Sequence, residues 1–127
     1  MTYKILIVDD SKLARMSAAR ALAALRPDWA VIEAANADEA IAQAKAGAID
    51  VALLDFNMPG RDGLVLAEEL RAIHPQMRLA VVSANHQAEI VARAVAVGAI
   101  FLQKPLTELA LGAFLDQVAA QLGSSAG

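Results

Sequence analysis

The sequence contains no cysteine. Disulfide bonds, zinc–thiolate sites and cysteine nucleophiles are therefore excluded. Its longest stretch without a charged residue is Gln117–Gly127, 11 residues, which is well short of the roughly 18 needed to span a membrane. No basic segment followed by a long apolar run stands at the N-terminus, as a secretory signal peptide requires. We therefore expect a cytoplasmic protein without membrane association.

Neither the charge nor the motifs favour binding to nucleic acids or nucleotides. The chain has 14 acidic and 11 basic residues, a net charge of −3, whereas proteins that bind a phosphate backbone carry a basic excess. The glycine-rich patterns G-x-G-x-x-G and G-x-x-x-x-G-K-[S/T] are both absent from the sequence. We expect no direct contact with nucleic acid.

What the sequence has in excess is alanine. Alanine accounts for 30 of the 127 residues and for most of a hydrophobic fraction of 57%, which exceeds the usual ~45–50%. Alanine is the best helix former, and this length is typical of one domain. We expect one helix-rich domain over residues 1–122, followed at 123–127 by a flexible tail or the start of a linker.

Short apolar runs without polar alternation predict strands that are buried on both faces, as in a parallel sheet. Four runs have this form: Ile5–Val8, Val51–Leu54, Leu79–Val82 and Ile100–Leu102. A fifth candidate, Trp29–Ala34, carries Glu33 and is predicted to be an edge strand.

Segments with helical spacing separate these runs: Lys12–Leu25, Ala37–Ala46, Leu64–His74, Gln87–Val97 and Thr107–Leu122. Asn36 with Glu39 forms a capping-box pattern before the second helix, and Thr107 can cap the last one. The order strand–helix, repeated five times, predicts a doubly wound α/β domain with a parallel sheet covered on both faces.

Polar side chains follow four of the five predicted strands. Asp9 and Asp10 come after the first, and Asp55 ends the third. Ser83 ends the fourth, and Lys104 follows the fifth. Ligands of open parallel sheets bind beyond the carboxyl ends of the strands, so we expect these side chains to form a site at one rim.

Three carboxylates close together raise one another's pKa or recruit a cation. A ligand set of oxygens alone suits Mg²⁺ or Mn²⁺ and leaves positions open for phosphate oxygens. Each residue alone has a simpler interpretation: an N-cap for the Asp9–Asp10 pair, a turn cap for Asp55, a solvated hydroxyl for Ser83 and a surface lysine for Lys104. Their convergence on one rim favours a site.

On these residues the chain resembles the receiver domain of bacterial two-component response regulators, over essentially its whole length. The resemblance lies in four segments: Val8–Ser11, Leu54–Gly63, Val82–Ala84 and Lys104–Pro105. It implies a flavodoxin-like fold in which five parallel strands, in the order 2-1-3-4-5, are covered by five helices.

The resemblance also implies roles for the rim residues. Asp55 matches the phosphoacceptor of the family. Asp9 and Asp10 match the acidic pair that holds Mg²⁺, and Asp55 and the main-chain carbonyl of Asn57 complete the protein ligands. Ser83 and Lys104 match the residues that contact the phosphoryl group.

Further positions follow from the same resemblance. Phe101 stands where the family has an aromatic switch residue, which turns from exposed to buried when Ser83 is drawn inward. Pro105 follows the lysine, often after a cis peptide bond. Asn57 and Asn85 stand near the place of the water that hydrolyses the acyl phosphate.

The resemblance implies a signalling switch rather than a conventional enzyme. A histidine kinase or histidine phosphotransfer protein supplies the phosphoryl group, and the domain catalyses its own phosphorylation and dephosphorylation. We expect output by protein docking through helix 87–97, strand 100–103 and helix 107–122, from a monomer or weak dimer. The chain is either a single-domain regulator or a fragment of a larger one.

Two other interpretations remain open at this stage. The alternative function is a Mg²⁺-dependent phosphohydrolase with an aspartate nucleophile, which typically has a D-x-D motif, whereas Asp9 and Asp10 are adjacent here. The second interpretation is a degenerate receiver that serves only as a scaffold. The presence of all three acidic residues together with Ser83 and Lys104 argues against it.

Overall fold

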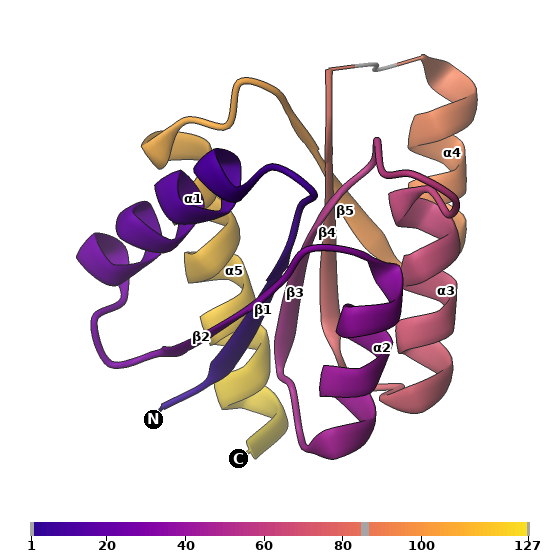
Figure 1. The fold of residues 1–127 in the computed structure, drawn as a ribbon. Helices are drawn as coiled ribbons and strands as arrows, with labels where there is room; N and C mark the ends of the chain where they lie inside the picture. The colour runs from indigo at the N-terminus through magenta and orange to yellow at the C-terminus, as the bar shows by residue number, and fades with distance from the viewer. Residues whose placement is uncertain (1, 85–86, 127) are drawn as a thin grey trace.

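A computed structural model of the protein describes residues 2–84 and 87–126. Within them the chain alternates five times between strand and helix (Figure 1). The elements are β1 (Lys4–Val8), α1 (Lys12–Leu25), β2 (Ala30–Ala34), α2 (Ala37–Ala46), β3 (Val51–Asp55), α3 (Gly63–Ile73), β4 (Arg78–Ser83), α4 (Ala88–Ala96), β5 (Ala99–Gln103) and α5 (Glu108–Ala126).

The strands form one parallel sheet in the order β2-β1-β3-β4-β5. This confirms the predicted fold and places β2 at an edge. The register aligns Val8 with Leu54 and Asp55 with Val82, so that the ends of β1, β3 and β4 reach the same rim. The loops that carry the predicted site residues therefore converge there.

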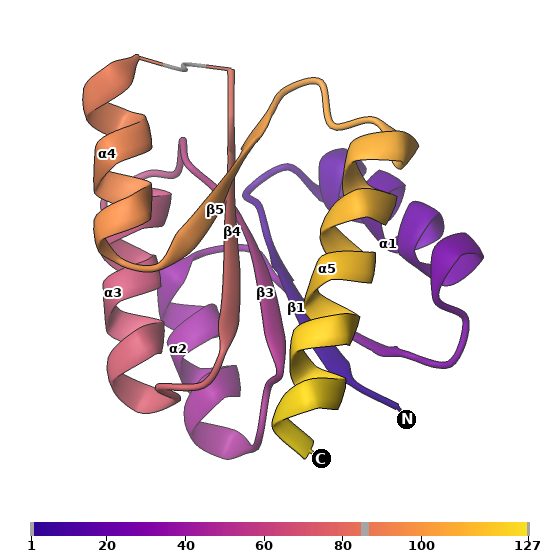
Figure 2. The same ribbon diagram turned by 180° about the vertical axis from the view of Figure 1, so that it is seen from behind.

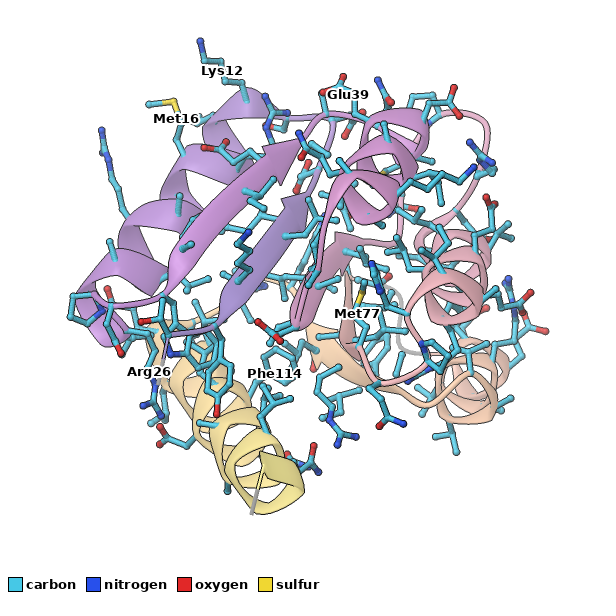
Figure 3. The ribbon with its side chains drawn as sticks, turned by 90° about the horizontal axis from the view of Figure 1, so that it is seen from below. Lys12, Met16, Arg26, Glu39, Met77 and Phe114 are labelled. Atoms are coloured by element: carbon cyan, nitrogen blue, oxygen red, sulfur yellow. The ribbon has the colours of Figure 1, made fainter. Side chains whose placement is uncertain are left out.

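The two faces of the sheet have separate hydrophobic cores. Helices α1 and α5 cover one face, and α2, α3 and α4 cover the other (Figures 1 and 2). Alternation along a strand sends successive side chains to opposite faces: Leu53 packs in the α1–α5 core and Leu54 in the other. Figure 3, seen from below, shows Phe114 directed from α5 toward the sheet, while Lys12 projects outward from α1.

Most predicted helix ends agree with the structure to within one residue. The capping box at α2 is confirmed, because Asn36 Oδ1 accepts a hydrogen bond from the Glu39 N–H at 2.8 Å. Thr107 caps α5 through the Ala110 N–H at 3.1 Å. The structure differs at the end of α5, which continues beyond Leu122 to Ala126; that residues 123–127 form a flexible tail stays a prediction.

Among the described residues, no helix combines the length and the apolar character needed to cross a lipid bilayer.

Candidate phosphoacceptor site

The turn between β1 and α1 holds the acidic pair. Ser11, and not an aspartate, is the N-cap of α1, and its hydroxyl accepts the Ala14 N–H at 3.2 Å. Asp9 Oδ1 accepts the Ser11 N–H at 2.9 Å. Asp9 is half-buried and Asp10 is exposed, which leaves the Asp10 carboxylate open to solvent and to ligands.

Asp55, the last residue of β3, is 5% exposed and faces a single cation. Lys104 Nζ donates to Asp55 Oδ1 at 2.6 Å. The Asn57 N–H points at the same oxygen, at 3.4 Å. A buried carboxylate requires a partner of this kind. The predicted meeting of Asp55 and Lys104 is therefore confirmed, and the peptide bond between Lys104 and Pro105 is cis.

The three carboxylates come together as the sequence predicts. Asp9, Asp10 and Asp55 each offer an oxygen within 4.8 Å of the others. Burial raises the pKa of the Asp9 carboxyl above its ordinary value, and the neighbouring Asp55 and Asp10 carboxylates raise it further; the Ser11 N–H and Lys104 oppose the rise. One lysine does not neutralise three carboxylates. The donor set, all oxygen and of excess negative charge, fits a hard dication such as Mg²⁺.

Ser83 and Phe101 lie on neighbouring strands, β4 and β5. Ser83 ends β4 and is fully buried. Strand alternation assigns it to the same face as Val81, which is paired with Phe101 on β5. The Phe101 ring is half-buried and packs against the α2–α3–α4 core. The two predicted switch residues therefore share the face that α4 covers. Asn85 lies outside the described residues.

The loop after β3 is held close to Asp55 by a glycine. Gly63, the first residue of α3, donates its N–H to Phe56 O at 2.9 Å. A Cβ atom at Gly63 would lie 2.5 Å from the carbonyl oxygen of Asp55, which is closer than atoms that are not bonded can approach. Glycine is thus required where α3 begins next to the Asp55 carbonyl.

Charged groups brace the same loop. Asp62 caps α3 by accepting the Leu64 and Val65 N–H groups, each at 2.9 Å, and Arg93 of α4 lies 3.3 Å from its carboxylate. Arg61 pairs with Glu69 of α3 at 2.8 Å and also with Asp38 of α2. These contacts connect the Asp55 loop to three helices.

Sequence reasoning missed three residues that hold the site. Arg15 contacts the main chain of Asp9, Gly63 leaves room for the Asp55 carbonyl, and Ser11 caps α1. A signal was present only for Ser11, because serine just before a helical segment is a favoured N-cap. The other two act across the fold.

A cavity of about 990 Å³ opens beside the site, between α1 and the start of α5. Its wall includes Asp9, Asp55 and Lys104, and on the α1 side Ala18 and Ala21. Asp55 therefore borders open space between the two helices. A group can therefore approach Asp55 even though its own side chain is 5% exposed.

Comparison with known proteins identifies the family of this chain. The model of the response regulator receiver domain matches residues 5–116. The chemotaxis protein CheY of Bacillus subtilis is 34% identical over 107 residues, covering 83% of this chain and 88% of that protein. The glycerol metabolism activator of Pseudomonas putida is 35% identical over 77% of this chain, which spans 45% of its length.

Solved structures share the fold. Chemotaxis protein CheY4 of Vibrio cholerae has a TM-score of 0.84 at 28% identity, with 93% of this chain and 99% of that chain covered. A chain of the CheX-CheY-BeF3-Mg complex from Borrelia burgdorferi has a TM-score of 0.83 at 26% identity, with 91% of this chain and 88% of that chain covered. The matches give no support to the phosphohydrolase alternative. The chain belongs to the receiver domain family of two-component response regulators, whose members are phosphorylation-activated signalling switches.

Proposed function

We propose that Asp55 is the residue that accepts the phosphoryl group, from a phosphohistidine of a histidine kinase or phosphotransfer protein. One observation carries this proposal: a buried carboxylate at a strand end, 2.6 Å from the Lys104 ammonium and within 4.8 Å of two further carboxylates. An Asp55 oxygen attacks phosphorus, the new P–O bond forms as the P–N bond breaks, and the imidazole leaves with the electron pair.

Asp9, Asp10 and Asp55, with the main-chain carbonyl of Asn57, are the proposed ligands of Mg²⁺, for which Mn²⁺ can substitute. When bound, a dication together with Lys104 would offset the charge of the three carboxylates and would offer open positions to phosphoryl oxygens. Lys104 stays beside Asp55 and pairs with a phosphoryl oxygen of the product. Because a carboxylate is a weak nucleophile, these charges and their positions supply most of the rate enhancement.

Ser83 is proposed to bind a phosphoryl oxygen through its hydroxyl, and Phe101 to move further into the α4 face when it does. The shared face of the two residues supports this coupling. The phosphorylated and unphosphorylated states then differ in the surface of α4 and β5. Hydrolysis of the acyl phosphate at the same site returns the domain to its resting state.

The proposed docking surface is helix 87–97, strand 100–103 and helix 107–122. On α4, Ile90 and Ala94 are buried against the sheet, whereas Val95 is 71% exposed. An exposed valine on the helix above Phe101 is available to a partner protein. The monomeric or weakly dimeric state and the cytoplasmic location stay predictions.

Acetyl phosphate tests the function directly. The purified protein with acetyl phosphate and Mg²⁺ is expected to gain the mass of one phosphoryl group, and excess EDTA is expected to prevent the gain. Asp55→Asn should show none, while Asp50→Asn, at the opposite end of β3, should match the wild type. Phosphoryl incorporation into Asp55→Asn at the wild-type level would contradict the assignment.

A further inference from the structure

Arg15, in the first turn of α1, reaches back to Asp9, which lies two residues before the N-cap Ser11. Its Nη1 donates to the main-chain carbonyl oxygen of Asp9 at 2.6 Å. Its Nε lies 3.3 Å from Glu33 Oε1 on the edge strand β2. The Arg15 side chain is 14% exposed, so this contact is largely shielded from water and from salt. No role in the site is evident for Arg15 from its place in the sequence.

The contact completes a set of hydrogen bonds that immobilises Asp9. The Asp9 N–H donates to Ala34 O at 3.2 Å, and Asp9 Oδ1 accepts the Ser11 N–H at 2.9 Å. With the Arg15 bond, the amide, the carbonyl and the carboxylate of Asp9 are each held by a different part of the chain. The carbonyl that Arg15 holds belongs to the peptide plane that leads from Asp9 into Asp10, so this bond orients the main chain between the two carboxylates.

We propose that Arg15 is a positioning residue of the acidic site, holding the Asp9 main chain so that the Asp9 and Asp10 carboxylates stand where a dication requires them. This rests on the proposed Mg²⁺ site. The Arg15 guanidinium donates to the Asp9 carbonyl oxygen and to the Glu33 carboxylate. Arg15 therefore acts on the acidic site through the main chain of Asp9.

Glu33 supports Arg15 by pairing with its guanidinium. It is paired with Ile7 in the sheet register, beside the end of β1. Its carboxylate orients the guanidinium, and the fork of the guanidinium lets one side chain bond Asp9 and Glu33 at once. A lysine has the charge without the fork. The arrangement predicts that Arg15→Lys does not replace arginine fully, even though the net charge is unchanged.

Titration calorimetry of Mg²⁺ binding tests the proposal without any phosphorylation step. Loss of an outer residue that orients metal ligands typically costs 10–100-fold in affinity. We expect Arg15→Ala to weaken Mg²⁺ binding by about tenfold and Arg15→Lys by less. Glu33→Gln should have the smallest effect of the three. At saturating Mg²⁺, the phosphorylation rate of Arg15→Ala with acetyl phosphate should return toward the wild-type value, because only ligand placement is impaired.

The matched control is Arg26→Ala. Arg26 lies just after the other end of α1 and pairs with Asp116 of α5 at 2.6 Å, so its loss removes an ion pair from the same helix far from the site. Arg26→Ala should bind Mg²⁺ as the wild type does. The amide hydrogen of Ser11 should exchange faster in Arg15→Ala and not in Arg26→Ala.

The possible outcomes separate the two proposals. Wild-type Mg²⁺ affinity in Arg15→Ala and Arg15→Lys would overturn the role of Arg15, as would an equal loss in Arg26→Ala. If Arg15→Ala does not fold, Arg15→Lys decides alone. A wild-type protein that binds no Mg²⁺ would instead refute the proposed metal site.

Discussion

Asp50 and Asp55 stand at the two ends of β3, and their surroundings differ. At the start of the strand, Asp50 Oδ2 accepts the Lys4 N–H at 2.8 Å, and the Asp50 carbonyl accepts the Arg78 N–H at 2.9 Å. Asp50 thus joins β1 to β4, through its carboxylate on one side and its main-chain carbonyl on the other. At the other end, Asp55 pairs with Lys104 at 2.6 Å and has the Asp9 and Asp10 carboxylates within 4.8 Å.

The difference shows how one sheet combines stability with function. The Asp50 carboxylate has a hydrogen-bond partner in the neighbouring strand and stabilises the sheet. The carboxyl-end carboxylates repel one another, and a bound cation would relieve that repulsion. Functional sites commonly retain such unfavourable interactions, which the rest of the fold supports. Substitutions at the two ends are therefore expected to affect stability and Mg²⁺ binding differently.

Gly63→Ala, next to Asp55, is the substitution with the largest expected effect on stability and on phosphorylation. The added Cβ would meet the Asp55 carbonyl oxygen at 2.5 Å, so either α3 or the end of β3 must shift. We expect the free energy of unfolding to fall by about 1–3 kcal/mol and phosphorylation by acetyl phosphate to slow markedly. Urea denaturation and intact mass measurement check these two effects.

Gly47→Ala is the control for that substitution. Nothing lies within 4 Å of a Cβ at Gly47, and its φ of −173° is open to any residue. Its effect should stay within about 0.5 kcal/mol. Equal stability of the two variants would contradict the close packing of α3 against Asp55.

Lys104→Met should separate the effects of charge on stability and on metal binding. Without the ammonium, the buried Asp55 loses its cation, and the metal-free protein should be about 1 kcal/mol less stable. Mg²⁺ should bind about fivefold more tightly, because the positive charge of Lys104 beside Asp55 no longer repels it. Calorimetry in metal-free buffer measures this, and weaker Mg²⁺ binding would show that Lys104 supports the metal site instead of opposing it.

Asp9→Asn should have a smaller effect on stability, and in the opposite direction. The amide oxygen can still accept the Ser11 N–H, while the charge that burial and the other carboxylates disfavour is gone. The melting temperature in EDTA should rise by a few degrees at neutral pH. Mg²⁺ binding should weaken, because a proposed ligand has lost its charge.

The sign of the pH dependence follows from the raised pKa of Asp9. A carboxyl whose pKa is higher in the folded state stabilises the fold below its unfolded value of 3.8, and this contribution is lost as the pH rises through the folded pKa. The advantage of Asp9→Asn should therefore be absent at low pH and grow as the pH rises. Asp50→Asn should show no comparable gain, and an equal gain there would remove the contrast between the two ends.

The sequence predicts those features that depend on local pattern. The buried runs, the capping box at Asn36 and the convergence of Asp9, Asp55 and Lys104 all follow from periodicity and from the rule that parallel strands end at one rim. The β2 edge strand was recognisable because Glu33 interrupts its apolar residues.

Other features arise only when distant segments pack. Arg15 and Glu33 meet across α1 and β2, and Gly63 is needed because α3 starts against the Asp55 carbonyl. Neither contact leaves a pattern in the nearby sequence. The helical spacing predicts that the last helix ends at Leu122, yet α5 continues to Ala126, since helix ends are weakly encoded by propensity alone.

The central claim is that Asp55 forms the acyl phosphate, and reduction of that bond locates it. The protein is treated with acetyl phosphate and Mg²⁺, reduced with borohydride, digested and sequenced by mass spectrometry. The account predicts homoserine in place of aspartate at position 55, dependent on Mg²⁺. Homoserine at Asp9 or Asp10, with Asp55 unmodified, would contradict it.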